Sequence, residues 1–91
     1  MKKYKDILII KNKDKIIVKK ALENLHKEGY IETIIIKNDK SNLFSEYPNS
    51  AFAIRSDSYI DNKTDDCRIL GFAIWFYFDE NSEIIGRETW D

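Results

Sequence analysis

Glycine, proline, cysteine and histidine are all scarce in this 91-residue sequence, which has three, one, one and one of them. The lone cysteine, Cys67, cannot form an intramolecular disulfide, so nothing in the sequence requires an oxidising compartment. Gly29, Gly71 and Gly86 stand far apart, so a glycine-rich loop that could cradle a phosphate is absent. The few glycines and the single proline indicate well-defined elements with few long loops.

Groups for catalysis are equally few. His26 is the only histidine, and it lies at the edge of the polar face of a predicted helix, with no partner for acid–base chemistry in view. Cys67 precedes Arg68, which could make the thiol more reactive, but a small side chain at the start of a strand is the simpler interpretation. We therefore expect no enzymatic activity and no cofactor.

Four closely spaced acids suggest calcium ligands at first sight: Asp57, Asp61, Asp65 and Asp66. An EF-hand needs oxygen ligands at alternate positions and a glycine in the middle of the loop. Position 59 is a tyrosine and position 62 an asparagine, so the pattern does not fit. Turn chemistry explains Asp61-Asn62, and we predict no metal site.

Long hydrophobic runs are also missing near the start of the chain. Ile7 to Ile10 is only four residues, whereas a signal peptide needs about 7–15 apolar residues and a membrane helix about 20. With 43% hydrophobic and 34% charged residues, the composition is that of a soluble globular protein. We expect one domain over residues 1–91, in the cytoplasm.

The first half of the chain predicts a β-α-β unit. Residues 5–11 and 31–37 are rich in β-branched residues and indicate strands, with a right-handed crossover if they are parallel. Between them, residues 15–28 carry apolar residues at helical spacing: Ile17, Val18, Ala21, Leu22 and Leu25. Asp14 or Asn12 can cap this helix, and Gly29 is placed to end it in a left-handed conformation with Tyr30 folding back.

The second half predicts a three-stranded antiparallel meander. Residues 38–50 form a polar connector that Leu43, Phe44 and Tyr47 pin to the body, and Pro48 keeps it out of a central strand. A half-buried strand over 51–56, which can continue to residue 60, precedes a loop over 61–66 and a hairpin over 69–90. The predicted fold is α+β, a single sheet of about five strands with one main helix packed on it.

The long strand of the hairpin has two different faces. One is uniformly apolar and is assigned to the core under the helix: Leu70, Phe72, Ile74, Phe76 and Phe78. The other carries Ile69, Gly71, Ala73, Trp75 and Tyr77. A turn centred on Asn81-Ser82 places Trp75 opposite Glu88 and Tyr77 opposite Gly86, with Trp90 diagonal to Trp75.

Charge is distributed unevenly, although the net charge is only −1. Residues 1–40 hold eleven of the fifteen basic residues against six acids, and residues 41–91 hold four basic residues against ten acids. Residues 21–31 look like the end of a winged-helix recognition helix, which would suit a small nucleic-acid-binding protein. That fold needs two earlier helices, and an acidic second half opposes phosphate binding.

Acidic and aromatic residues of the second half together suggest a protein-binding surface. Aromatic anchors supply much of the energy of protein interfaces, and complementary charge raises the association rate. The alternative is that the acidic loops are ordinary solvated turns and that Trp75 belongs to the core. The candidate partner-binding residues are Asp57, Asp61, Asp65, Asp66, Trp75, Tyr77, Asp79, Glu80, Glu83, Glu88 and Trp90.

The small size, the composition rich in Lys, Ile and Asn, and the acidic aromatic hairpin over residues 71–86 resemble small bacterial immunity proteins of toxin–immunity systems. The resemblance covers roughly the last forty residues and carries no specific residue across. It implies a cytoplasmic protein that binds a cognate toxin, commonly a nuclease with a basic surface, with no membrane partner. A phage-encoded inhibitor of a host nuclease would have the same features.

Overall fold

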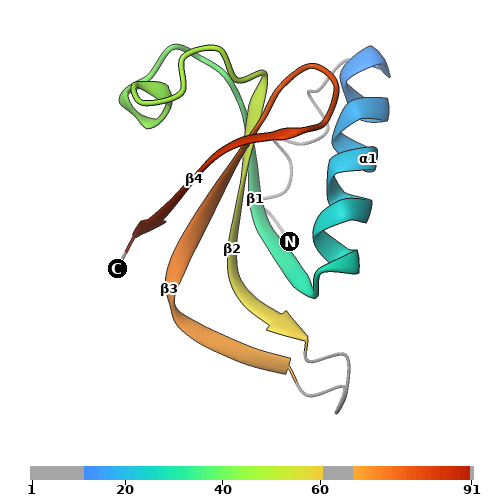
Figure 1. The fold of residues 1–91 in the computed structure, drawn as a ribbon, viewed down its shortest axis with the longest axis vertical. Helices are drawn as coiled ribbons and strands as arrows, with labels where there is room; N and C mark the ends of the chain where they lie inside the picture. The colour runs from blue at the N-terminus through green and yellow to red at the C-terminus, as the bar shows by residue number, and fades with distance from the viewer. Residues whose placement is uncertain (1–11, 61–66, 91) are drawn as a thin grey trace.

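The computed structural model describes residues 12–60 and 67–90. One helix is followed by a four-stranded antiparallel meander in the order β1-β2-β3-β4, an α+β arrangement (Figure 1). The elements are α1 (Asn12–Lys27), β1 (Tyr30–Lys37), the short 3-10 helix η2 (Asn42–Phe44), β2 (Phe52–Ile60), β3 (Cys67–Phe78) and β4 (Ile84–Trp90).

Four of the five predicted strands are therefore present in one sheet, and β1 joins it antiparallel to β2. The predicted strand over residues 5–11 lies outside the described residues, and so does the predicted loop over residues 61–66.

Helix α1 starts earlier than predicted. It begins at Asn12, so Asn12 and Asp14 belong to its first turn, and the prediction of a cap at Asp14 is wrong. The end is as predicted, because Gly29 has a φ of 97°. A Cβ atom at this position would lie 2.6 Å from the carbonyl oxygen of Ile60, whose N–H donates to the Gly29 carbonyl at 2.7 Å. Only glycine satisfies both the backbone conformation and this close approach.

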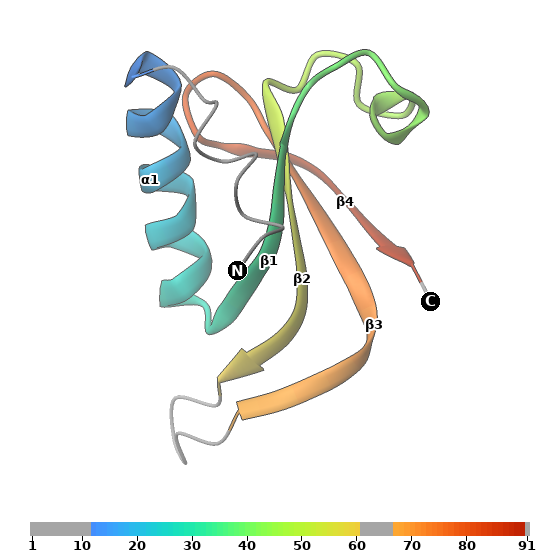
Figure 2. The ribbon, with the colours of Figure 1, turned by 180° about the vertical axis from the view of Figure 1, so that it is seen from behind.

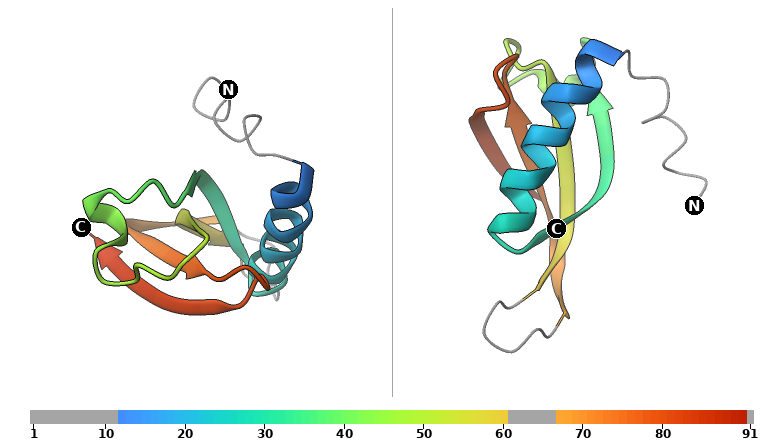
Figure 3. Two further views of the ribbon diagram at one scale, coloured as in Figure 1. Left: turned by 90° about the horizontal axis from the view of Figure 1, so that it is seen from above. Right: turned by 90° about the vertical axis from the view of Figure 1, so that its right-hand side faces the viewer.

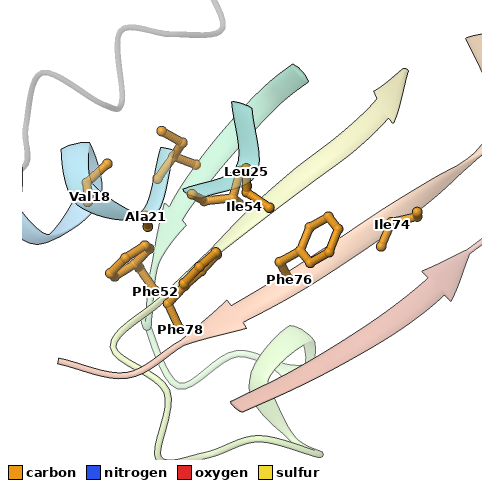
Figure 4. Close-up of a cluster of buried hydrophobic side chains, with 9 residues drawn as sticks. Val18, Ala21, Leu25, Phe52, Ile54, Ile74, Phe76 and Phe78 are labelled. Atoms are coloured by element: carbon orange, nitrogen blue, oxygen red, sulfur yellow. The ribbon is translucent and has the colours of Figure 1, made fainter. Parts of the chain in front are cut away.

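One core lies between α1 and the sheet (Figure 4). Val18, Ala21 and Leu25 supply the helix side. The rings of Phe52 and Phe78 stack with their centroids 5.2 Å apart on the sheet side. The apolar face predicted for the long strand is confirmed, with three residues buried and two half-buried: Ile74, Phe76 and Phe78, then Leu70 and Phe72.

A second core lies on the opposite face of the sheet, beneath the connector that joins β1 to β2. Phe44 of η2 is buried there, and Leu43 and Tyr47 pack beside it, as the sequence predicted. Helix α1 and the connector thus lie on opposite sides of the strands (Figure 2 and the view from above in Figure 3). Because both faces are covered here, residues 52–54 of β2 are fully buried, and the prediction of a half-buried strand is wrong for this part.

The hairpin has the predicted register. Trp75 pairs with Glu88, Tyr77 with Gly86, and Ala73 with Trp90, which places Trp90 diagonal to Trp75. A bulge follows, because Phe78 pairs with Ile84 and leaves residue 85 unopposed. The long strand and its return strand therefore meet as expected, while the bulge changes the exposure of residues next to the turn.

Candidate protein-binding surface

Two of the three aromatic residues expected to contact a partner are inside the protein. Trp75 is 6% exposed and Tyr77 is fully buried. The Tyr77 hydroxyl donates to the Leu43 carbonyl at 3.0 Å, and its ring lies 4.7 Å from that of Tyr47 and 5.9 Å from that of Phe44. The expected exposed aromatic patch is therefore wrong for Trp75 and Tyr77, because the connector covers them.

Glu88 belongs to this buried arrangement rather than to a free acidic surface. It is half-buried, opposite Trp75, and it interacts with Tyr77. Burial first and the nearby Glu88 carboxylate second raise the pKa of Tyr77 to about 12. Trp90 pairs with Ala73 through the backbone, and its side chain lies outside what the structure describes.

Asp57 lies on β2, away from the hairpin turn. Its carboxylate is 3.4 Å from the Arg55 guanidinium, which also lies 3.1 Å from the Thr33 hydroxyl. Phe52 pairs with Phe78 at the turn end of the sheet, so five residues at about 3.4 Å each place Asp57 roughly 17 Å from that end. Asp57 is therefore partly neutralised and separate from the hairpin acids.

Asp61, Asp65 and Asp66 lie outside the described residues. In the sequence they fall between Ile60, which ends β2, and Cys67, which begins β3. Their predicted role in partner binding stays a prediction.

Asp79 stabilises the hairpin turn through hydrogen bonds within the turn. Its Oδ1 accepts from the N–H groups of Asn81 at 2.8 Å and Glu83 at 3.0 Å, and its own N–H donates to the Glu83 carbonyl at 2.9 Å. Ser82, with a φ of 64°, is buried and donates its hydroxyl to the Ile17 carbonyl in α1 at 2.7 Å. These bonds fix the shape of the turn and hold it against the helix.

Glu80 and Glu83 project from this fixed turn into solvent. Within residues 12–60 and 67–90, neither carboxylate is part of an ion pair. Beside them, Ile84 is 51% exposed and Ile85 is 39% exposed. We define these four residues as the hairpin tip: Glu80, Glu83, Ile84 and Ile85.

Sequence reasoning missed the two isoleucines, because an Ile-Ile pair at the start of a strand is normally half-buried. The clue in the sequence was that Gly86 follows the turn after only two residues, Ile84 and Ile85. Tyr47 lies directly over Gly86, so the ring occupies the space of a side chain there, and a Cβ atom on Gly86 would overlap it. Gly86 pairs with Tyr77, and the register shift next to this pair leaves residue 85 unopposed.

Of the two residues considered for catalysis, Cys67 has a side chain outside what the structure describes, and His26 lies in the last turn of α1. His26 is 52% exposed at the end of α1, with Nε2 2.6 Å from a carboxylate oxygen of Glu32. In the part of the chain that the structure describes, no three His, Cys, Asp or Glu side chains gather as metal ligands would. The same part contains no helix that is long and apolar enough to cross a membrane.

No protein-family model, curated protein or solved structure matches this chain.

Proposed function

We propose that this protein is a non-enzymatic, protein-binding inhibitor, and specifically an immunity protein that neutralises a cognate toxin, with a nuclease as the expected toxin. The observation that carries the proposal is the hairpin tip, where two carboxylates that form no ion pair in the described part of the chain precede two exposed isoleucines. Exposed apolar residues rimmed by polar groups are typical of protein-binding sites.

The hairpin tip is rigid before any partner binds. Asp79 closes the turn, Ser82 ties it to α1, and Tyr47 holds Gly86 from the other side of the sheet. A surface that is already ordered loses less conformational entropy on binding, so more of the contact energy appears as affinity.

The chemistry of the hairpin tip suits a basic partner. A nuclease binds the phosphate backbone of its substrate with lysines and arginines, which gives its active cleft a positive potential. Glu80 and Glu83 would accelerate encounter with such a cleft, and Ile84 and Ile85 would exclude water from the contact. The inhibitor would then occupy the surface that the nucleic acid needs.

This proposal keeps only some of the partner-binding residues that the sequence predicted. Trp75 and Tyr77 stabilise the fold, Asp79 shapes the turn, and Glu88 packs near Tyr77. Glu80 and Glu83 keep the role predicted for them, and the isoleucines take the place of the aromatic anchors.

If the reading frame immediately upstream encodes a large secreted toxin, the test uses that toxin's domain, with association measured by surface plasmon resonance and protection measured as growth during toxin expression. Replacing Glu80 and Glu83 together with lysine should slow association at low salt by about tenfold or more, because both steering charges change sign. The matched control replaces Glu23 and Glu46, which are exposed on α1 and on the connector. Equal slowing in both variants, or none in either, would show that the hairpin tip is not the binding site.

The same surface suits a phage-encoded inhibitor of a host nuclease. Phage structural genes beside the reading frame, in place of a large secreted toxin, would favour that alternative. The binding experiment is then repeated with the host nuclease.

Nucleic-acid binding is a second candidate because of one feature of α1. Its outer face exposes Lys19, Lys20 and Lys27. If these lysines bind phosphates, affinity for duplex DNA should rise as salt is lowered and should fall when all three are replaced by glutamine. A DNA affinity that is immeasurable at low salt excludes this role.

A further inference from the structure

Next to the hairpin tip there is a hollow of about 580 Å³. It is bounded by the N-terminal half of α1, the connector and the β3–β4 turn, which meet at one end of the sheet (Figure 1). Small-molecule sites commonly have volumes of roughly 300–1,000 Å³. The hollow is thus large enough for an organic ligand.

Different parts of the lining of this hollow carry apolar, basic and acidic side chains. Its floor is apolar, with Ile17 and Val18 from α1 and Ala51 and Phe52 from the start of β2. Its connector wall carries Lys40, and Lys37 at the end of β1 also lines it. The opposite wall is the hairpin turn, with the carboxylate of Glu80.

Both walls are held in place by hydrogen bonds. On the connector side, the Asn38 amide donates to the Ser50 carbonyl at 2.7 Å and to the Pro48 carbonyl at 3.1 Å, and its oxygen accepts from the Lys40 N–H at 2.9 Å. On the turn side, the Ser82 hydroxyl reaches the Ile17 carbonyl. The hollow is therefore pre-formed, as ligand sites usually are.

Lys40 has an unusual backbone. Its φ is 66°, in the left-handed region that lysine rarely adopts and that glycine or asparagine would occupy more easily. The side chain is exposed at the rim and makes no ion pair within the described parts of the chain. A strained residue is a reason to look for a function, and here the strain accompanies an ammonium group at the mouth of an apolar hollow.

We infer that this hollow binds a small amphipathic anion, such as a medium-chain carboxylate. The apolar body lies on Ile17, Ala51 and Phe52, where it is removed from water. The carboxylate lies toward Lys40, and repulsion from Glu80 orients it to the connector side. A free inorganic anion would leave the apolar floor unused, and a neutral apolar molecule would leave Lys40 unused.

The experiment titrates the full-length protein with octanoate and follows backbone amide shifts by NMR. Saturable shifts should appear at Ile17, Lys40 and Ala51, and 1-octanol should bind at least fivefold more weakly because it lacks the charge. Lys40→Asn should weaken octanoate binding at least fivefold, while asparagine suits the left-handed backbone and preserves the fold. Lys20→Asn, which removes one exposed charge from the outer face of α1, should leave the affinity unchanged.

Three results would overturn the inference. They are equal affinities for octanoate and octanol, shifts that map away from the hollow, and a Lys40→Asn variant that binds octanoate as the parent does. As a second check, Ala51→Leu should fill the floor and block binding, and thermal unfolding would verify that this variant is folded. Octanoate binding does not depend on a toxin, so this experiment can fail while the proposed inhibitor function stands.

Discussion

The two faces of the sheet are covered in different ways. On one face, α1 presents a continuous apolar stripe to Phe52, Ile54 and Phe76. On the other, an irregular connector covers Trp75 and Tyr77 with a few side chains. A helix satisfies its own backbone hydrogen bonds and distributes its contacts over several turns, whereas the connector depends on a small number of specific contacts. The connector side should therefore be the more sensitive to single substitutions.

The largest effects are expected from removing one anchor on each face. Phe44→Ala should lower the free energy of unfolding by about 3–5 kcal/mol, and Leu25→Ala by about 2–5 kcal/mol, since both side chains are buried. Urea unfolding measures both values. In a Trp90→Phe background, Phe44→Ala should also shift Trp75 fluorescence to longer wavelength in native buffer, because the connector no longer excludes water. If Leu25→Ala produces the same fluorescence shift, loss of an anchor on the helix side also exposes Trp75 to water. The two faces of the sheet then do not unfold separately.

A smaller effect is expected where the connector contacts the hairpin. Gly86→Ala places a methyl group in the space of the Tyr47 ring and should destabilise the protein by about 1–3 kcal/mol. Most of this loss should disappear in a Tyr47→Ala background, because the overlapping ring is then gone. A double-mutant cycle from urea unfolding measures this coupling, and additive losses would contradict the contact.

On the helix side, the corresponding contact is the hydrogen bond that the Ser82 hydroxyl donates to the Ile17 carbonyl. Ser82→Ala removes the hydroxyl donor and should lower the free energy of unfolding by about 0.5–1.5 kcal/mol. Ser82→Gly provides the control, since it also removes the hydroxyl but relieves the left-handed backbone at this position. A Ser82→Ala variant as stable as the parent would show that the bond contributes nothing.

The prediction with the smallest effect on stability at neutral pH concerns the pKa of Tyr77. Its pKa is about 12 in the folded protein and about 10 when unfolded, so folding favours the protonated phenol. The resulting stability is fully present below pH 10 and is lost as the pH rises from about 10 to 12. Absorbance at 295 nm should show one late-titrating tyrosine, and Tyr77→Phe should remove it while Tyr59→Phe should not. A late component that survives Tyr77→Phe would assign the raised pKa elsewhere.

Much of the fold was predictable from local pattern. The spacing of Val18, Ala21 and Leu25 predicted the buried face of α1, and Gly29 predicted its end. The alternation along residues 70–78 predicted which face lies under the helix. The hairpin register also followed from the length of the turn. These features depend on residues close together in the chain, where periodicity and turn geometry act directly.

The candidate surface was predictable only in part. Glu80 and Glu83 are exposed as expected, but Trp75 and Tyr77 are covered by a segment about thirty residues earlier in the chain. Nothing in the alternation of β3 distinguishes a face covered by a connector from a face left for a partner. Ile84 and Ile85 are exposed next to a bulge at residue 85, and Gly86 beside that bulge lies against Tyr47.

By itself, the sequence determined the elements: a helix with one apolar face, strands that alternate, and a polar turn over residues 79–83. The tertiary structure alone decided which aromatic residues are buried and which apolar residues are exposed beside the acids. The physical reason is that burial depends on what covers a face, and the covering segment here is an irregular connector. Its contacts are long-range, so no local period in the sequence encodes them.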